Sequence, residues 1–114
     1  MKLDIHDHGQ YKVLRVEEEL EIITDLSELK FIIDGYLTRG IHKVAVSFIG
    51  TAYIYSGAIA VLMECHKKLL DFDDGKLCIL EANEDIKAIF SALHIDKILD
   101  IYDSEDDLPK YGSH

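Results

Sequence analysis

The sequence is poor in the residues that break or cross-link a polypeptide chain. Its 114 residues include one proline, seven glycines, two cysteines and no tryptophan. So little proline and glycine excludes a long disordered or collagen-like segment. Cys65 and Cys78 both fall in apolar, periodic segments. We therefore expect two buried thiols in a reducing compartment and no disulfide framework.

Positive charge is also scarce, since 12 Lys and Arg stand against 22 Asp and Glu, a net charge of −10 at pH 7. Such a surface repels phosphate backbones and anionic membranes, so direct binding to nucleic acid or membranes is not expected. We interpret the acidic runs at 17–21 and 103–107 as solvated faces; the alternative is contact with a basic patch on a protein partner. No apolar run could span a membrane, and Asp4 and Asp7 interrupt any signal-peptide pattern, so we expect a cytoplasmic protein.

The standard enzymatic motifs are missing. Neither GxGxxG nor GxxxxGK[ST] occurs, and a GxSxG elbow around Ser56 fails because Ile54 replaces its first glycine. No spacing ties a histidine to Ser56 as a general base. Asp4, His6 and His8 would share one face of a strand, but they are too few for a metal site. The sequence thus predicts no catalytic residue, no cofactor and no metal.

What the sequence does contain is an alternation of strand and helix patterns. The predicted strands span 11–17, 43–49, 76–81 and 97–102, with a possible edge strand at 1–8, and the predicted helices span 25–40, 57–70 and 84–93. Residues 43–49 and 76–81 are nearly continuous apolar runs, typical of strands covered on both faces. We expect a single α/β domain over residues 1–114, with a mixed, mostly parallel sheet of four to five strands and helices mainly on one face.

Several residues mark where the helices begin and end. Asp25 with a glutamate three residues later resembles a capping box, and Gly40 is a suitable stop for the same helix. Asn83 is predicted to cap the helix at 84–93, and Ser104 to cap a short terminal helix.

The most informative stretch is AYIYSGAIAVL at 52–62, where a loop runs directly into an apolar helix pattern. Ser56 stands at this corner, and its simplest role is that of the helix N-cap. Gly57, Ala58 and Ala60 also leave the first helical turn without bulk, so a partner's backbone or a phosphate could approach closely. A phosphoryl group on Ser56 would lie at the positive end of the helix and add about two negative charges.

The run VAVSFIGTAYIYSGAIAVL at 44–62 resembles the STAS domain of bacterial anti-sigma-factor antagonists, whose pattern is S-x-V-x-F-I-D-S-S-G-L-G-V-L after a strand of the type V-V-L-D-L. The segments 19–24 and 76–108 resemble the family's entry to its first helix and its closing elements. Without a gap, the strand aspartate of the pattern falls on Ser47, the loop aspartate on Tyr55, and the phosphate-accepting serine on Gly57. A one-residue shift would place Ser56 on the acceptor. Ser56 is therefore either a displaced switch serine or only a helix cap.

The resemblance implies a non-enzymatic protein switch. A domain of this type binds a serine kinase or anti-sigma factor, is released when that kinase phosphorylates it, and is restored by a phosphatase. The implied docking surface comprises Tyr53, Tyr55, Ser56, Gly57, Ala58, Glu64 and Lys67, with Ser56 as the phosphorylation site. Tyr55 is either an interface anchor or a ring packed over the loop.

Two alternatives stay open at this point. The chain could be a STAS-like scaffold without the switch, or a subunit of a signalling or lipid-transport assembly, as Gly57 at the acceptor position suggests. It could instead be a small α/β enzyme or nucleotide-binding protein that uses the turn at Ser56. Neither the identity of the partner nor the oligomeric state follows from the sequence.

Overall fold

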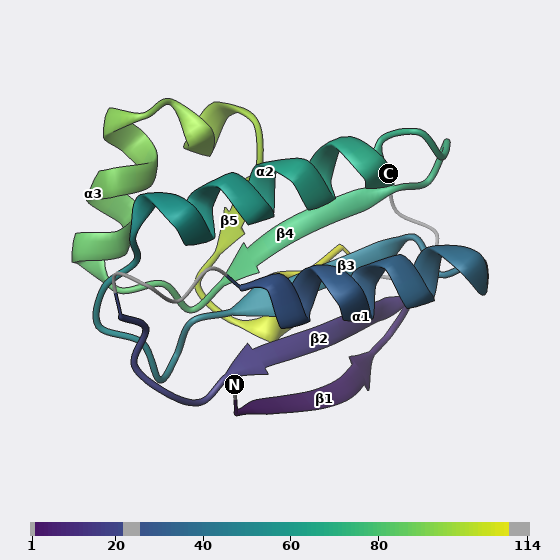
Figure 1. Cartoon of the computed structure of the whole chain (residues 1–114), viewed down its shortest axis with the longest axis horizontal. Coiled ribbons are helices and arrows are strands. Elements are labelled where there is room, and N and C mark those ends of the chain that lie inside the picture. The colour runs from purple at the N-terminus through teal and green to yellow at the C-terminus, as the bar shows by residue number, and fades with distance from the viewer. Residues whose placement is uncertain (1, 22–25, 110–114) are drawn as a thin grey trace.

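The computed structural model describes residues 2–21 and 26–109, and its centre is a five-stranded sheet (Figure 1). The strands are β1 (Leu3–His8), β2 (Tyr11–Val16), β3 (Lys43–Ser47), β4 (Lys76–Leu80) and β5 (Asp100–Tyr102). They lie in sequence order; β1 pairs with β2 antiparallel, and the other neighbours are parallel. This confirms the expected mixed, mostly parallel sheet, including the edge strand at the N-terminal end.

Helices α1 (Ser27–Thr38) and α2 (Ser56–Leu69) cover one face of the sheet, and α3 (Glu84–Ala92) lies at its end (Figure 1). Two 3₁₀ turns follow, η1 (Ile95–Lys97) and η2 (Glu105–Asp107). Each helix connects two neighbouring parallel strands, so the chain is a series of βαβ crossovers, as the alternation of patterns predicted. No helix in the described residues is long and apolar enough to cross a membrane.

Both faces of the central strands are buried. Leu14, Val46 and Ile79 point into the main core beneath the helices. Their strand neighbours Val13 and Cys78 belong to a second apolar cluster on the opposite face, which also contains Leu108 from the C-terminal segment. Two covered faces explain why β3 and β4 read as continuous apolar runs instead of alternating patterns.

The two cysteines are free and fully buried, as predicted. Cys65 belongs to the main core and Cys78 to the second cluster. Burial raises the pKa of each thiol to about 11, because the thiolate loses its hydration inside the protein. Both side chains are therefore packing groups at neutral pH and not nucleophiles.

The helix signals agree with the structure at two of four positions. Gly40 ends α1 with a φ of 77°, a left-handed conformation that glycine adopts without strain. Asn83 caps α3, and its Oδ1 accepts a hydrogen bond from the Ile86 N–H at 2.8 Å. Asp25 lies outside the described residues. Ser104 does precede η2, but it makes no capping hydrogen bond and the element is a three-residue turn.

The predicted strand at 97–102 is wrong in its first half. Residues Ile95–Lys97 form η1, and the Leu99 N–H donates to the Ile95 carbonyl at 2.8 Å instead of to a strand. Strand β5 begins only at Asp100. The side chain of Ile98 is consequently 50% exposed. An apolar run of mixed helical and extended conformation cannot be divided by periodicity alone.

The turn η2 is held against the sheet by Glu105. Its carboxylate accepts hydrogen bonds from His6 Nε2 at 2.8 Å and from Arg15 Nη2 at 2.6 Å, and it lies 3.3 Å from His8 Nδ1. His6 also contacts Asp4 at 2.9 Å through Nδ1. The hydrogen bond to Glu105, opposed by burial and assisted by Asp4, raises the pKa of His6 above 6.5. Burial alone would raise the pKa of Glu105, but His6, Arg15 and His8 together lower it below 4.5.

These shifts predict a pH window for the contact. The His6 contribution is complete below pH 6.5 and is lost as the pH rises through its raised folded pKa. The Glu105 contribution is present above pH 4.5 and is lost as the pH falls through its lowered folded pKa. The free energy of unfolding, measured in urea, should therefore differ most between the wild type and His6→Gln in the range from pH 4.5 to pH 6.5. His94→Asn, which removes an exposed histidine outside the contact, is the control variant. A His6→Gln difference that persists unchanged at high pH would contradict the prediction.

Candidate functional site

The loop between β3 and α2 lies where the carboxyl ends of the parallel strands meet. It is anchored at both ends by Phe48 and Ile54, each 1% exposed, while Ile49 and Tyr53 between them are 58% and 44% exposed. The sequence pattern places Ile49 in a buried strand at 43–49, whereas the structure exposes its side chain in the loop. The strand ends at Ser47, and Gly50, which directly follows Ile49, is the local signal of that early end.

Neighbouring connections hold this loop in one conformation. Thr51 is buried, and its hydroxyl donates to the Glu18 carbonyl at 3.2 Å. The Ala52 N–H donates to Glu19 Oε2 at 2.8 Å, and the Ala52 carbonyl accepts from Asn83 Nδ2 at 2.9 Å. Gly50 lies so close to β2 that an added Cβ would be 3.1 Å from the Val16 carbonyl oxygen. The loop is thus positioned by the segments that follow β2 and β4.

Ser56 is the first residue of α2, and its predicted role as N-cap is wrong. Tyr55 occupies the cap position in an extended conformation, and its carbonyl accepts the Ile59 N–H at 3.1 Å. The Tyr55 side chain makes no capping hydrogen bond. Ser56 is exposed, and its hydroxyl forms no hydrogen bond with any described residue. The first turn of α2 therefore presents free backbone N–H groups beside an accessible hydroxyl.

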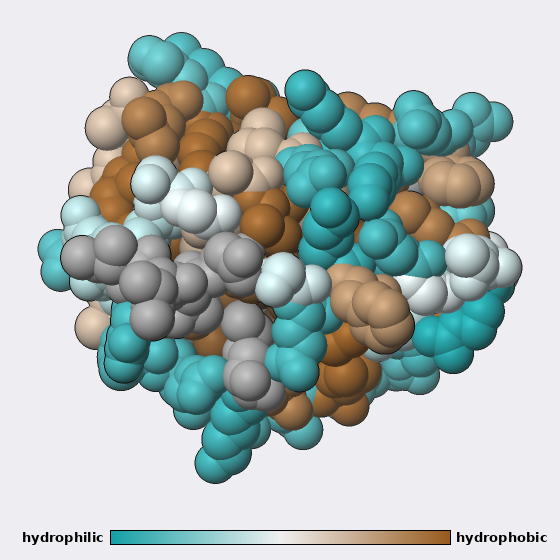
Figure 2. Space-filling view, in the orientation of Figure 1, coloured by the Kyte–Doolittle hydropathy of each residue, from teal (hydrophilic) through white to brown (hydrophobic). Residues whose placement is uncertain are grey.

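Most of the predicted docking residues share one surface. The exposed residues of α2 recur three or four positions apart and form one stripe, which comprises Ser56, Gly57, Ala60, Glu64 and Lys67. Figure 2 shows apolar and weakly polar surface over the first half of α2 and over α3, and hydrophilic surface over the second half of α2. The stripe thus runs from an apolar end to a charged end.

The individual docking residues differ in how they are placed. Tyr53 and half-buried Tyr55 contact each other edge to face, with ring centroids 5.1 Å apart. Glu64 pairs with Lys30 of α1 at 3.0 Å. Ala58 requires a correction, because it is fully buried in the main core and offers no side-chain surface. Its small side chain lets α2 pack close to the sheet at the corner.

Within residues 2–21 and 26–109, Ser56 has no catalytic partner. In the described parts of the chain, no histidine or carboxylate forms a hydrogen bond with its hydroxyl. His42 instead pairs with Asp74 at 2.7 Å. Asp4, His6 and His8 do share one face of β1 as predicted, but His6 and His8 contact Glu105, and Asp4 pairs with His6. No cluster of three or more ligands suited to a metal ion occurs among the described residues.

Ser47, where the STAS pattern has an aspartate, is fully buried, and its hydroxyl donates to Glu81 Oε1 at 2.7 Å. Glu81 follows β4 in the left-handed conformation with a φ of 60°. Its backbone N–H donates to the Tyr102 carbonyl at 3.0 Å. A carboxylate is thus supplied near the end of β3 by the neighbouring strand, a replacement that the sequence alone did not indicate.

Comparison with solved structures identifies the architecture. A candidate anti-sigma factor antagonist of Thermotoga maritima is 22% identical, with a TM-score of 0.79 over 90% of this chain and 86% of that one. An anti-sigma factor antagonist of Mycobacterium paratuberculosis is 16% identical, with a TM-score of 0.78 over 93% and 88%. An anti-sigma-factor antagonist (STAS) domain protein of Planctomyces limnophilus is 14% identical, with a TM-score of 0.67 over 92% of each chain. The chain has the STAS fold. No protein-family model and no curated protein matches the sequence.

Within this STAS fold, Asn83 has two separable roles that a pair of substitutions can test. Its Oδ1 caps α3, and its Nδ2 holds the Ala52 carbonyl. Asn83→Asp should keep the cap, because aspartate also accepts, but it should release the loop. Asn83→Ala should lose both and cost about 1 kcal/mol of stability.

Hydrogen exchange of amides 49–55 measures the loop, and urea unfolding measures the cap. We expect faster loop exchange in both variants but a clear loss of stability only in Asn83→Ala. Loop exchange in Asn83→Asp equal to that of the wild type would show that Asn83 does not hold the loop.

Proposed function

We propose that this protein is a non-enzymatic regulator of the anti-sigma-factor-antagonist type, acting in the cytoplasm. It binds a serine kinase or anti-sigma factor through the loop 48–55 and the exposed stripe of α2. Phosphorylation of Ser56 by that partner releases it, and a phosphatase restores binding. The observation that carries the proposal is the accessible, unpaired hydroxyl of Ser56 at the start of a helix, in a loop that is already held in place.

The geometry suits a switch because Ser56 is central to the surface that a partner would cover. Tyr53 and Ile49 lie before it in the loop, and both side chains are substantially exposed. Tyrosine is a frequent binding hot spot, since it buries a large ring at low entropic cost. About two added charges at Ser56 would be tolerated by the free N–H groups of α2, but they would have to be desolvated in the complex. Phosphorylation would therefore weaken binding while leaving the fold intact.

A second candidate function is a scaffold that binds its partner permanently. It is favoured by Gly57, which occupies the acceptor position when the STAS pattern is aligned without a gap. Both functions use the same docking surface, and they differ only in whether Ser56 accepts phosphate.

Ser56 substitutions distinguish these functions. The purified protein is incubated with ATP and a serine kinase of the anti-sigma type from the same organism, and intact mass is measured. We expect one added phosphoryl group on the wild type and none on Ser56→Ala. We also expect Ser56→Ala to bind the unreacted kinase like the wild type, and Ser56→Asp to bind at least about tenfold more weakly, a loss of about 1.4 kcal/mol.

Ser91→Asp is the matched control, because Ser91 is an exposed serine on another helix, α3, and is not part of the docking stripe. It should bind like the wild type. Stable binding without any mass gain would replace the switch by the permanent scaffold. Equal binding by the Ala and Asp variants of Ser56 would remove Ser56 from the interface.

A further inference from the structure

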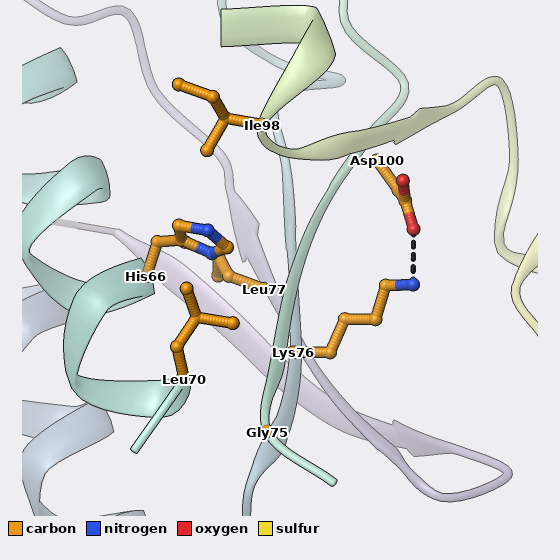
Figure 3. A pocket seen from close by; sticks show the side chains of 7 residues that line it. All are labelled: His66, Leu70, Gly75, Lys76, Leu77, Ile98 and Asp100. Carbon is orange, nitrogen blue, oxygen red and sulfur yellow. Dashed lines mark ion pairs between the residues drawn. The ribbon is translucent and has the colours of Figure 1, made fainter. Parts of the chain in front are cut away.

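A recess lies at the end of α2 opposite the Ser56 corner. A pocket of about 340 Å³ opens between the last turn of α2, the start of β4 and the segment that precedes β5 (Figure 3). Its apolar walls are Leu70, Leu77 and Ile98. Leu70 and Ile98 are 58% and 50% exposed, so they form the rim, whereas Leu77 is buried at the base. Pockets of this size, mostly apolar with few polar groups, are typical of small-molecule sites.

The late start of β5 creates this recess. β5 pairs with β4 only from Cys78 to Leu80. At Lys76 and Leu77, no described strand covers the edge of β4 on that side, and the turn η1 carries the chain away from it. The pocket thus occupies the space in which a longer β5 would have continued the sheet.

His66 is a polar side chain buried in this apolar recess without a partner. Figure 3 shows its ring extending from α2 toward β4, between Leu70 and Ile98. The residue is only 7% exposed. Its Nδ1 is shielded from solvent and unpaired, and neither ring nitrogen bonds to a described residue. Burial lowers the pKa of His66 below 6.5, so the ring is neutral at pH 7, with one donor and one acceptor nitrogen. Because Nδ1 is shielded from solvent, a ligand in the pocket would bond to the other ring nitrogen, Nε2, which is also unpaired among the described residues.

The two charged side chains that line the pocket are paired with each other. The Lys76 ammonium and the Asp100 carboxylate form an ion pair, which Figure 3 shows on the far side of β4 from His66. Asp100 partly opposes the effect of burial on the pKa of His66, but its carboxylate is paired with Lys76. With a net charge of −10 on the whole chain, an anion would also be repelled. These features favour a neutral ligand.

We propose that this pocket binds a small neutral molecule with an apolar body and one hydroxyl group, which forms a hydrogen bond with the imidazole of His66 and packs against Leu70, Leu77 and Ile98. The site is separate from the Ser56 corner, and it does not depend on the function proposed there.

Phenol and benzene are suitable probes, because they differ only in the hydroxyl. Each is titrated into the ¹⁵N-labelled full chain while amide and imidazole resonances are recorded. Phenol should cause saturable shifts at Leu70, Leu77 and Ile98 and in the His66 ring, and benzene should bind roughly tenfold more weakly. His66→Leu, which keeps the bulk but removes the hydrogen bond, should weaken phenol roughly tenfold and leave benzene unchanged or tighter.

Two further variants keep the test decisive. His94→Asn changes an exposed histidine in a left-handed position that asparagine accepts, and it should bind phenol like the wild type. Ile98→Trp should fill the mouth and abolish binding; because Ile98 is half exposed, this change needs no space in the core. The proposal is overturned if phenol causes no saturable shifts at the pocket, if benzene binds as tightly as phenol, or if Ile98→Trp binds like the wild type.

Discussion

Burial of β3 and β4 on both faces is the constraint on which the rest of this structure depends. Two helices cover one face, and the C-terminal segment, through Leu108, closes part of the other. A strand that is covered on both faces carries apolar side chains on both. Its polar side chains are therefore confined to its ends. Ser47 illustrates this, since it is the last residue of β3 and its hydroxyl still needs the carboxylate of Glu81. Chemistry and recognition are consequently restricted to the two edges of the sheet.

At the carboxyl edge, the loops that follow three parallel strands converge and bind one another. Glu19 and Asn83 reach the same residue, Ala52, from opposite sides. A loop that is already held in one conformation loses less conformational entropy on binding a partner than a flexible loop would. In the proposed complex, the exposed side chains of Ile49 and Tyr53 would therefore contribute to affinity, and the small residues at the start of α2 would leave room for the partner. This is a favourable arrangement for recognition, whereas a catalytic serine would need a base, and no described residue forms that contact with Ser56.

The sequence predicted those features that depend on local chemistry. The apolar runs of β3 and β4, the stop at Gly40 and the cap at Asn83 each follow from a few adjacent residues. The incorrect predictions concern residues whose placement depends on contacts with distant parts of the chain. Ser56 reads as a cap, but the helix starts one residue earlier because Tyr55 takes the extended conformation. The sequence predicts Ala58 to be in an exposed first turn, but its side chain lies on the face of α2 that packs in the core. The alignment of Ser47 with an aspartate gave no sign of Glu81, which a different strand supplies.

The His66 pocket could not be found in the sequence, because three separate elements create it and none carries a motif. Its position also decides how it relates to the Ser56 corner. Both residues belong to α2, and at about 1.5 Å of rise per residue they are separated by roughly 15 Å along the helix. That distance exceeds the screening length of about 8 Å at physiological ionic strength, so charge added at Ser56 has little direct effect on the imidazole. The remaining route would be movement of the helix itself, which Ala58, Leu62 and Leu69 resist because they are fixed in the core. The two sites are thus expected to act independently.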